Sequence, residues 1–475
     1  MTRYFIGIDN GSQSSKVTVF DEHGRVVSEG RQALRPYDTP RPGVVEHPGD
    51  DLWDSIGEAG RRAMAAFPGD TADIVGVGLC TIRFCRALLR ADGSPAQPVL
   101  SWMDDRVSRP HEDTDPQVRY VTTSSGYITH RMTGAFRDTA ANYAGMWPLD
   151  ADTWQWSQDE AVLAAAGLRR EMLFDLVAPG DVLGTVTEEA ARHTGIPAGL
   201  PVVATANDKA VEALGCGLRM PDTLLVSLGT YVAGMTTGPR NVPGAQGFWT
   251  NYASVPGRYL YESFGVRRGM WTVSWVRDLL GGEAAGAGRA PGTSVEDHLN
   301  AEAAKVPAGC DGLMTILDWL APTEAPYRKG SMLGFDGRQG PYHVYRSVLE
   351  GLALTLHSTA GLMAGELGTG FERLLVSGGG SRSDLAMQIF ADVFGVPAHR
   401  PQVTGAAGLG AAICAAVGLG VHASFDEAVE AMVRPGAVFT PEAGNHALYG
   451  RLSKVYEQVR EHTDPLYRTA QAVLG

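Results

Sequence analysis

The chain has 475 residues, of which 44% are hydrophobic, and its formal net charge is −13 at pH 7. A chain of this length usually forms about two or three domains, and the hydrophobic fraction is ordinary for a soluble globular protein. The acidic balance argues against nucleic acid and anionic membranes as partners, while local backbone N–H groups remain able to hold anionic ligands. The five cysteines are scattered without metal-ligand spacing, and the N-terminus has no apolar signal core. We therefore expect a cytoplasmic protein without a membrane segment.

The first predicted element is a β-hairpin over residues 4–20. An apolar run is followed by the turn-forming sequence Asp9-Asn10-Gly11-Ser12 and then by alternating apolar and polar residues. Gly11 permits a tight turn whose backbone N–H groups point toward an anion. Asp9, at the strand end, can hold a metal ion or its water ligands with oxygen. An ordinary hairpin with a solvated Asp9 is the alternative explanation.

The remainder of the first half alternates strands and helices. The apolar patterns predict strands at residues 25–27, 74–79, 87–89, 98–102 and 201–205. Helices are predicted over residues 50–67, 153–168, 187–194 and 210–214. Residues 107–150 are polar and irregular, and we expect no regular structure there.

The opening pattern recurs about halfway along the chain. A strand at 223–227, a Gly turn and a returning strand at 231–235 repeat the first hairpin, which indicates an internal duplication. Later strands are predicted at residues 258–264 and 374–377, and helices at 270–280, 343–366, 384–394 and 404–418. The Gly/Ala/Pro-rich residues 281–292 predict a mobile loop.

Six segments, in order from Ile6 to Ala416, carry recognisable motifs: Asp9-Asn10-Gly11-Ser12-Gln13-Ser14-Ser15-Lys16, Trp102-Met103-Asp104-Asp105-Arg106, Asp208 within residues 204–217, Ser227-Leu228-Gly229-Thr230, Ser377-Gly378-Gly379-Gly380-Ser381, and residues 404–412. Together they resemble the FGGY family of carbohydrate kinases. Each motif alone is weakly specific, but six in register over nearly the whole chain are a strong signal.

The resemblance implies an α/β fold, the duplicated actin-like (ribonuclease H-like) ATPase fold, with two lobes around a catalytic cleft. It places a sugar-binding lobe at residues 1–245 and a nucleotide-binding lobe at residues 246–475. The implied cofactors are ATP and Mg²⁺, with Asp9 as the metal residue. The residues implied in nucleotide binding are Gly11, Ser12, Gln13, Lys16, Gly229, Thr230, Gly378, Gly379, Gly380, Ser381 and Asp384.

Asp208 is the expected catalytic base, because the family places its base there and a hydroxyl nucleophile needs a proton acceptor within hydrogen-bond reach. Its position between a buried strand and a helix equally allows a helix N-cap. Lys209 departs from the amide usual after that Asp.

The expected sugar-binding residues are Arg83, Trp102, Asp104, Arg106 and Asp208. Arg83 is polyol-kinase-like, because glycerol kinases carry an Arg-Glu pair at this point, although Phe84 replaces the Glu. Core packing is the alternative for Trp102, and a surface position beside the strand is the alternative for Arg83. The segment from Arg106 to Thr133 is also shorter than in typical xylulokinases.

We therefore expect ATP-dependent phosphorylation of a small sugar or polyol, with a xylulokinase-like pentulose such as xylulose or ribulose as the first choice. A tetrose, a tetritol, glycerol or another polyol is the alternative substrate. A non-catalytic sugar sensor and a chaperone ATPase are the rivals from other classes. A homodimer is left open, and no nucleic-acid or membrane partner is expected.

Overall fold

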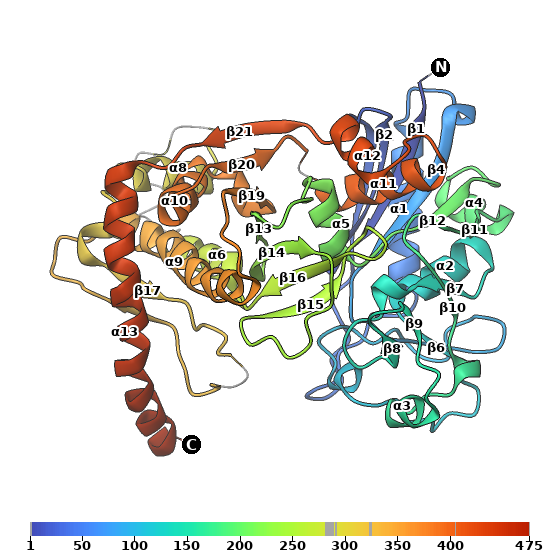
Figure 1. Ribbon diagram of the computed structural model, residues 1–475, viewed down its shortest axis with the longest axis horizontal. Helices are drawn as coiled ribbons and strands as arrows, with labels where there is room; N and C mark the ends of the chain where they lie inside the picture. The colour runs from blue at the N-terminus through green and yellow to red at the C-terminus, as the bar shows by residue number, and fades with distance from the viewer. Residues whose placement is uncertain (1, 281–288, 290–291, 323–324, 404, 475) are drawn as a thin grey trace.

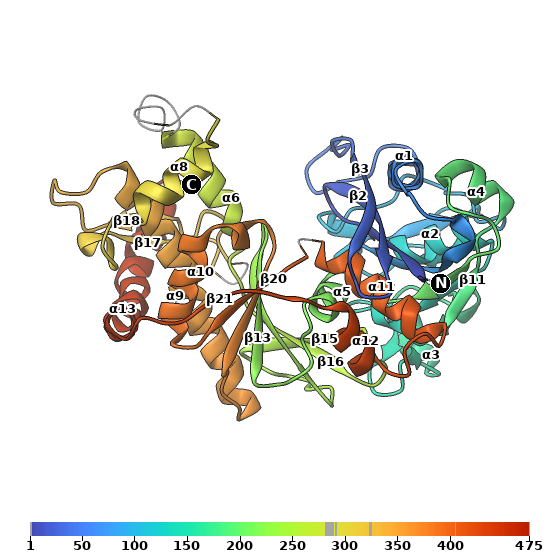
Figure 2. The same ribbon diagram turned by 90° about the horizontal axis from the view of Figure 1, so that it is seen from above.

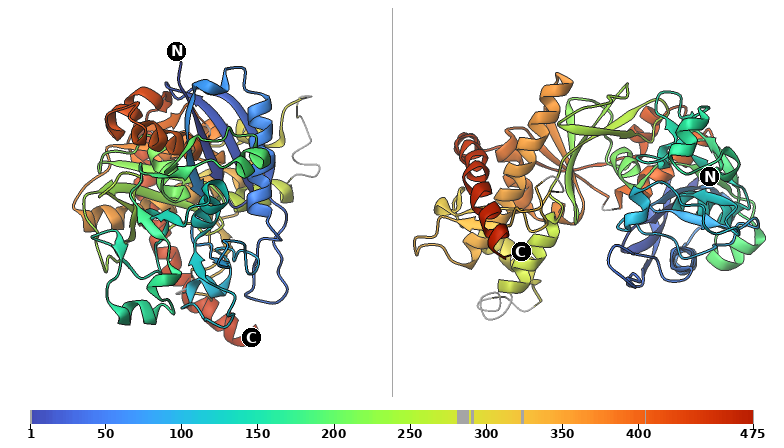
Figure 3. Two further views of the ribbon diagram at one scale, coloured as in Figure 1. Left: turned by 90° about the vertical axis from the view of Figure 1, so that its right-hand side faces the viewer. Right: turned by 90° about the horizontal axis from the view of Figure 1, so that it is seen from below.

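The structure is a computed structural model that describes residues 2–280, 289, 292–322, 325–403 and 405–474. It forms two α/β lobes side by side along the long axis, each built on one mixed sheet (Figures 1 and 2). Seen from below, the lobes meet in the middle of the molecule (Figure 3). Most of the predicted loop over residues 281–292, and the predicted helix start at residue 404, lie outside the described residues.

The first lobe contains a six-stranded sheet in the order β11-β12-β4-β1-β2-β3. Its strands are β1 (Tyr4–Asn10), β2 (Ser14–Asp21), β3 (Val26–Ala33), β4 (Ile74–Thr81), β11 (Val182–Thr185) and β12 (Pro201–Ala204). The predicted hairpin is confirmed, with Gly7 of β1 opposite Thr18 of β2, and β4 runs parallel to β1. Helices α1 (Asp51–Ala65), α2 (Ser124–Thr133), α4 (Glu188–Thr194) and α5 (Asp208–Gly215) belong to this lobe.

The second lobe repeats this arrangement within a seven-stranded sheet in the order β15-β16-β14-β13-β19-β20-β21. Its strands are β13 (Thr223–Leu228), β14 (Val232–Gly238), β15 (Phe248–Tyr252), β16 (Tyr259–Ser263), β19 (Arg373–Ser377), β20 (Ala398–Pro401) and β21 (Pro435–Phe439). Strand β19 pairs in parallel with β13, β14 pairs antiparallel with β13, and β16 pairs antiparallel with β14. These pairings match those of β4, β1, β2 and β3, so the predicted duplication is visible in the sheet order.

Helices α9 (Pro341–Leu367) and α10 (Asp384–Phe394) pack against the second sheet. Helices α6 (Gly269–Leu280), α8 (Val295–Ala303) and α13 (Ala443–Leu474) pack against α9, and α8 and α13 also pack against α10. Among the described ranges, no helix combines the length and the apolar character that crossing a bilayer requires.

Helix α11 (Ala406–Gly418) leaves the second sheet and returns to the first lobe, followed by α12 (Phe425–Met432) (Figure 1). It packs between β1, β4 and α5 with its backbone almost touching theirs. A Cβ added at Gly7 would lie 2.0 Å from the carbonyl oxygen of Gly408, and one at Gly410 would lie 2.0 Å from that of Val211. The predicted close packing of this Ala/Gly helix is therefore confirmed.

A division of the chain after residue 245 does not follow the sheets. Strands β13 and β14 precede this point but belong to the second sheet, and α11 and α12 follow it but pack on the first. We propose that the lobes divide between α5 and β13, with residues 406–432 completing the first lobe.

The structure contradicts three predictions of local structure. Residues 98–102 form no strand and make only single bridges through Leu100. Residues 107–150 contain α2, β6 (Tyr120–Thr122) and β7 (Arg137–Thr139). The buried hydroxyls of Thr123 and Ser125 donate to Asp138, so tertiary hydrogen bonds support a helix whose Ser/Thr content gives it low intrinsic propensity.

The third contradicted prediction is the helix over residues 153–168. Only α3 (Glu160–Ala165) is helical, and β9 (Gln155–Trp156) precedes it. Trp154 adopts a left-handed backbone with φ of 58° and donates its indole N–H to Tyr259 at 3.2 Å, while Trp156 donates to the carbonyl of Phe174 at 2.7 Å. These buried contacts override the local helical preference.

The contact between α11 and β1 gives the first prediction. Gly7→Ala should lower the melting temperature sharply, because the new methyl group overlaps the Gly408 carbonyl, and overpacking of this kind costs about 1–3 kcal/mol or more. Gly408→Ala is the matched control, since its Cβ would make only ordinary van der Waals contacts, with Phe20 at 3.7 Å and the Gly7 carbonyl oxygen at 3.9 Å, and Ala favours helix by up to about 1 kcal/mol. Equal melting temperatures for the two variants would contradict the predicted contact.

Candidate active site

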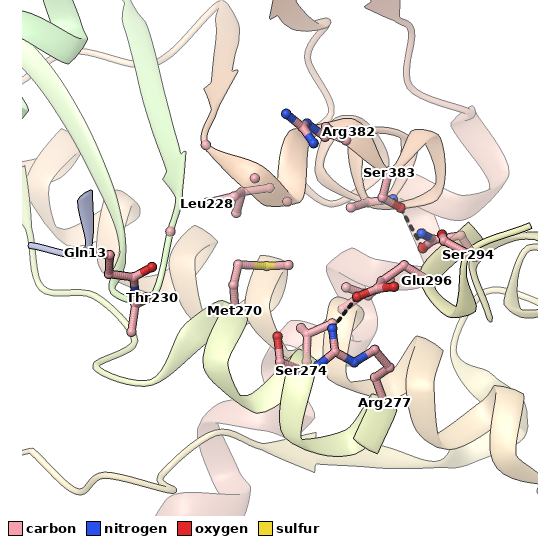
Figure 4. Close-up of a pocket in the computed structure, with 18 of the residues that line it drawn as sticks. Gln13, Leu228, Thr230, Met270, Ser274, Arg277, Ser294, Glu296, Arg382 and Ser383 are labelled. Atoms are coloured by element: carbon pink, nitrogen blue, oxygen red, sulfur yellow. Dashed lines mark hydrogen bonds and ion pairs between the residues drawn. The ribbon is translucent and has the colours of Figure 1, made fainter. Parts of the chain in front are cut away.

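A cavity of about 860 Å³ lies where three glycine turns meet between the lobes. The turns follow β1, β13 and β19, and the remaining wall comes mainly from α6, α8, α9 and α10 (Figure 4). Nine of the residues predicted for nucleotide binding line it: Gly11, Ser12, Gln13, Lys16, Gly229, Thr230, Gly378, Gly379 and Gly380. Gln13 donates to the hydroxyl of Thr230 at 3.5 Å, so the first two turns face each other across the lobes.

The third turn shows why three consecutive glycines occur. Gly378 has φ of 84°, and a Cβ there would lie 2.6 Å from the carbonyl oxygen of Leu228. A Cβ at Gly380 would lie 2.8 Å from the sulfur of Met270. Gly379 differs, because a Cβ there would meet no protein atom within 4 Å. The fold therefore requires the outer two glycines, whereas the middle one leaves open space in the cavity wall.

Two of the predicted nucleotide residues do not line this cavity. The Ser381 hydroxyl is buried and donates to the Gly378 carbonyl at 2.8 Å, so it supports the turn and faces a neighbouring cavity. Asp384 is largely exposed, begins α10, and pairs with Arg400 at 2.6 Å. Sequence reasoning missed other lining residues, among them Met270, Asn300, Tyr345 and Ser383.

A second cavity of about 300 Å³ brings Asp9 of β1 together with Asp208 of α5. Burial raises the pKa of Asp9 from 3.8 to about 6, with Asp208 adding to the effect and Lys16 opposing it. The two carboxylates lie beside the glycine turns and form an oxygen-rich, desolvated site. A divalent cation bound there would offset their unfavourable negative charge. The residues present therefore fit a Mg²⁺ ion bound with nucleotide.

Asp208 is the first residue of α5 but does not cap it. Asn207 is the N-cap, with its side-chain oxygen accepting from the N–H of Ala210 at 3.2 Å. One carboxylate oxygen of Asp208 is buried and has no hydrogen-bond partner in the described part of the chain. Burial raises the pKa of Asp208, and Arg83, whose Nε lies 4.0 Å from that oxygen, opposes the rise. The N-cap alternative for Asp208 is therefore excluded.

The charge of Lys209, the residue after Asp208, is balanced within the protein. Its ammonium donates to Glu212 at 2.8 Å and to the Ser227 hydroxyl at 2.7 Å. The hydroxyls of Ser227 and Ser377 donate in turn to the Glu212 carboxylate. This network links α5 of the first lobe to the ends of β13 and β19 in the second lobe, where the glycine turns begin.

Arg83 lies beside Asp208, as the prediction of a shared site required, but its guanidinium is already paired. It donates to both carboxylate oxygens of Glu262, at 2.7 and 2.9 Å. Its charged carbon lies 5.1 Å from the centre of the Phe84 ring and 5.0 Å from that of Trp249. Phe84 has φ of 64°, a strained conformation for a non-glycine residue that is common at functional sites. Arg83 therefore lies between the lobes and not on a free surface.

The Trp-x-Asp-x-Arg segment does not present its carboxylate to a ligand. The Asp104 side chain is 0% exposed and accepts from the N–H of Val45 at 2.8 Å and from the backbone and guanidinium of Arg106. Arg106 also pairs with Glu46 at 2.6 Å. This geometry argues against the predicted sugar contact, because the carboxylate is fully used within the protein. Trp102, by contrast, is exposed, so the core-packing alternative is wrong for it.

Sequence reasoning missed Glu262, although a signal was present. The strand Tyr259–Ser263 is buried throughout, and Glu262 is the one carboxylate within it. A buried carboxylate requires a partner, so this residue could have been singled out as half of an ion pair.

Comparison with known proteins decides the family. The model for the N-terminal domain of the FGGY family of carbohydrate kinases matches residues 4–112 and 107–215, and the C-terminal model matches residues 224–419. The chain belongs to this family. The FGGY chain is therefore a carbohydrate kinase, and the family uses ATP, generally with Mg²⁺. The N-terminal domain match ends and the C-terminal domain match begins between α5 and β13, which is also where the chain passes from the first sheet to the second.

Related sequences and structures agree with the assignment. The chain is 49% identical to the Escherichia coli (strain K12) protein named uncharacterized sugar kinase YgcE, over 99% of this chain and 96% of the relative. It is 25% identical to the autoinducer-2 kinase of Yersinia enterocolitica, over 98% and 95% of the two chains.

Solved structures share the fold over their full lengths. They include gluconate kinase from Lactobacillus acidophilus (TM-score 0.84, 20% identity, 99% and 100% coverage) and xylulose kinase from Rhodospirillum rubrum (0.83, 24%, 98% and 100%). Glycerol kinase from Plasmodium falciparum, solved with ADP, has a TM-score of 0.80 at 16% identity, covering 96% and 98%. These structures confirm the actin-like ATPase fold.

The open space at Gly379 gives the second prediction. Gly379→Val should fold normally and raise the KM for ATP far more than the KM for the sugar, because its side chain would project into the nucleotide cavity. Gly378→Ala is the control: its strained φ and its clash with Leu228 should lower the melting temperature. A Gly379→Val enzyme with equal rises in both KM values would contradict nucleotide binding at this turn.

The desolvated Asp9 gives the third prediction. Its folded-state pKa, about 6, exceeds the free value of 3.8, so the folded protein is destabilised by the ionised carboxylate above about pH 6. In the absence of Mg²⁺ and nucleotide, Asp9→Asn should melt at a higher temperature than wild type at about pH 8. The difference should shrink between about pH 6 and pH 4, where wild-type Asp9 gains its proton in the folded state. Melting curves across this range test the sign, and a difference that does not depend on pH would contradict the desolvation.

Proposed function

We propose that this FGGY kinase transfers the γ-phosphoryl group of ATP to a hydroxyl of a small sugar or polyol, with Asp208 as general base. The proposed substrate is a pentulose such as xylulose or ribulose. The observation that carries the proposal is the buried, unpartnered carboxylate oxygen of Asp208 in a cavity that also contains Asp9 and the glycine turns. An unpaired buried acceptor costs free energy, so its retention points to a ligand that completes it.

The nucleotide would lie in the large cavity, with its phosphates against the backbone N–H groups of the turns at Gly11 and Gly229. The Ser12 and Thr230 hydroxyls and the Lys16 ammonium supply further donors there. The adenosine end would contact the turn at Gly379 and the wall formed by α6, α8 and α10. Asp9 would hold Mg²⁺, directly or through water, and the ion supplies charge neutralisation on the phosphate oxygens.

Phosphoryl transfer depends on positioning and charge stabilisation more than on covalent catalysis. The substrate hydroxyl would donate to the Asp208 carboxylate and lose its proton to it as the hydroxyl oxygen bonds to the γ-phosphorus. The bond from that phosphorus to the β,γ-bridging oxygen breaks, and ADP leaves. Because burial raises the pKa of Asp208, this carboxylate is a stronger base than an exposed aspartate.

The retained acidic residues favour a kinase over a sugar sensor. A sensor that only binds sugar has no need of a desolvated carboxylate at the phosphate turns, yet Asp9 remains there beside Asp208. The structural relatives include proteins named as xylulose, glycerol and gluconate kinases. Each of these names refers to a small polyhydroxylated compound, and a pentulose is a compound of this kind.

The base gives the fourth prediction. Asp208→Asn preserves shape but removes basicity, so kcat should fall by about 10²–10⁴-fold, while the KM for the sugar stays within a few-fold. The melting temperature should not fall, because Asn207 and not Asp208 caps α5 and because a desolvated carboxylate has been removed. Coupled-enzyme detection of ADP with xylulose, ribulose, erythritol and glycerol measures the rates.

The control for this experiment separates loss of stability from loss of the base. Thr187→Ala removes the N-cap of α4, remote from the cavities, and should cost about 0.5–2 kcal/mol of stability with little loss of kcat. If Asp208→Asn retained near wild-type turnover on the best substrate, Asp208 would not be the base.

A further inference from the structure

The charges that surround Asp208 come from both lobes. Arg83 follows β4, Lys209 and Glu212 belong to α5, Glu262 belongs to β16, and Asp9 is the last residue but one of β1. Because the substrate hydroxyl must reach Asp208, the rest of a small substrate would lie near these groups. The way in which these charged groups pair with one another therefore decides which substituents the substrate can carry.

The two cations nearest the base are already matched by buried carboxylates. Arg83 is held by both oxygens of Glu262, whose side chain is 1% exposed. Lys209 is held by Glu212, whose remaining capacity is used by Ser227 and Ser377. With Asp208 itself included, this set of five carries one net negative charge.

Arg83 is also prevented from turning toward a ligand. Trp249 of β15 and Glu262 of β16 are directly opposite each other in the sheet, so they form one rigid surface of the second lobe. The guanidinium is bonded to Glu262 and lies 5.0 Å from the Trp249 ring and 5.1 Å from the Phe84 ring, whose centres are 6.0 Å apart. A bidentate, stacked guanidinium of this kind is fixed in both position and plane.

The other arginines near Asp208 lie on the nucleotide side. Arg382 lines the nucleotide cavity as well as the smaller one, where its charge would meet nucleotide phosphates. Arg400 reaches the smaller cavity from β20 and is paired with Asp384.

Resting on the proposed function, we infer that the substrate is an uncharged polyhydroxy compound and not a sugar acid, and that Glu262 is the residue that determines this specificity. A carboxylate on the substrate would meet Arg83 with its charge already neutralised, and would add a negative charge to a site that is negative already. Like charges placed together without water are strongly unfavourable. Hydroxyl groups can still accept from the outer N–H groups of Arg83 and donate to Asp208.

Matched pairs of compounds test the inference. Xylitol and xylonate, ribitol and ribonate, and arabinitol and arabinonate differ only in whether one end is CH₂OH or a carboxylate. Each compound is assayed for ADP release with Mg-ATP and for binding by thermal shift, with xylulose and ribulose included. For wild type we expect the neutral member of each pair to bind about tenfold or more tightly than the acid.

Two variants of Glu262 separate charge from structure. Glu262→Gln keeps the shape and leaves Arg83 with an unmatched charge, so the ratio of neutral to acid affinity should shift about tenfold or more toward the acid. Glu262→Asp shortens the side chain but keeps the charge, so it should lose activity yet keep the wild-type ratio. A role limited to joining the lobes would lower both affinities together in both variants.

The outcomes separate this inference from the proposed function. Preferential phosphorylation of an aldonate by wild type would overturn the inference and leave the kinase assignment intact. Binding of a neutral compound without its phosphorylation would overturn the proposed function and support the inference. A ratio that is unchanged in a folded Glu262→Gln protein would overturn the role of Glu262, and no binding of any neutral compound would overturn both proposals.

Discussion

The close contact of α11 with β1, β4 and α5 is the constraint on which the site depends. Carbonyl groups of α11 lie where side chains on Gly7 and Gly78 would be, and one of α5 lies where a side chain on Gly410 would be, so the elements approach at backbone distance. Strand β1 carries Asp9 and helix α5 carries Asp208. Their relative position is therefore set by a contact that tolerates almost no additional volume. The spacing of Asp9 and Asp208 therefore depends on glycines at the contacts between β1, β4, α5 and α11.

The same site concentrates charge on side chains that are largely or partly buried. Asp9, Asp208, Glu212 and Glu262 are balanced in part by Lys16, Lys209 and Arg83. The Arg83–Glu262 ion pair crosses from the first lobe to the second, so it links the lobe arrangement to the electrostatics around Asp208. Arg83 and Glu262 join the lobes through two hydrogen bonds, whereas Gln13 and Thr230 make only a long contact between the glycine turns.

Much of this arrangement could be predicted from sequence because its signals are local. The hairpins around Gly11 and Gly229, the buried strand before Asp208 and the turn at Gly378 each have a turn residue beside an apolar run. What could not be predicted depends on partners far along the chain. Asp104 resembles a ligand residue in sequence, but Val45 and Arg106 use its oxygens. The helix expected around Trp154 is absent because Tyr259 and Phe174 hold the two tryptophans instead.

The path of the chain also affects how this protein is made. One hydrophobic cluster joins Phe5 and Phe20, near the N-terminus, with Ile413 of α11 and Met432 of α12. A ribosome has therefore synthesised nearly the whole polypeptide before the first lobe can complete its core. Until then β1 and β4 expose an apolar face that α11 will cover. The contacts that complete this core join residues far apart in the sequence, which form slowly, and an apolar face that stays uncovered meanwhile favours aggregation of the nascent lobe.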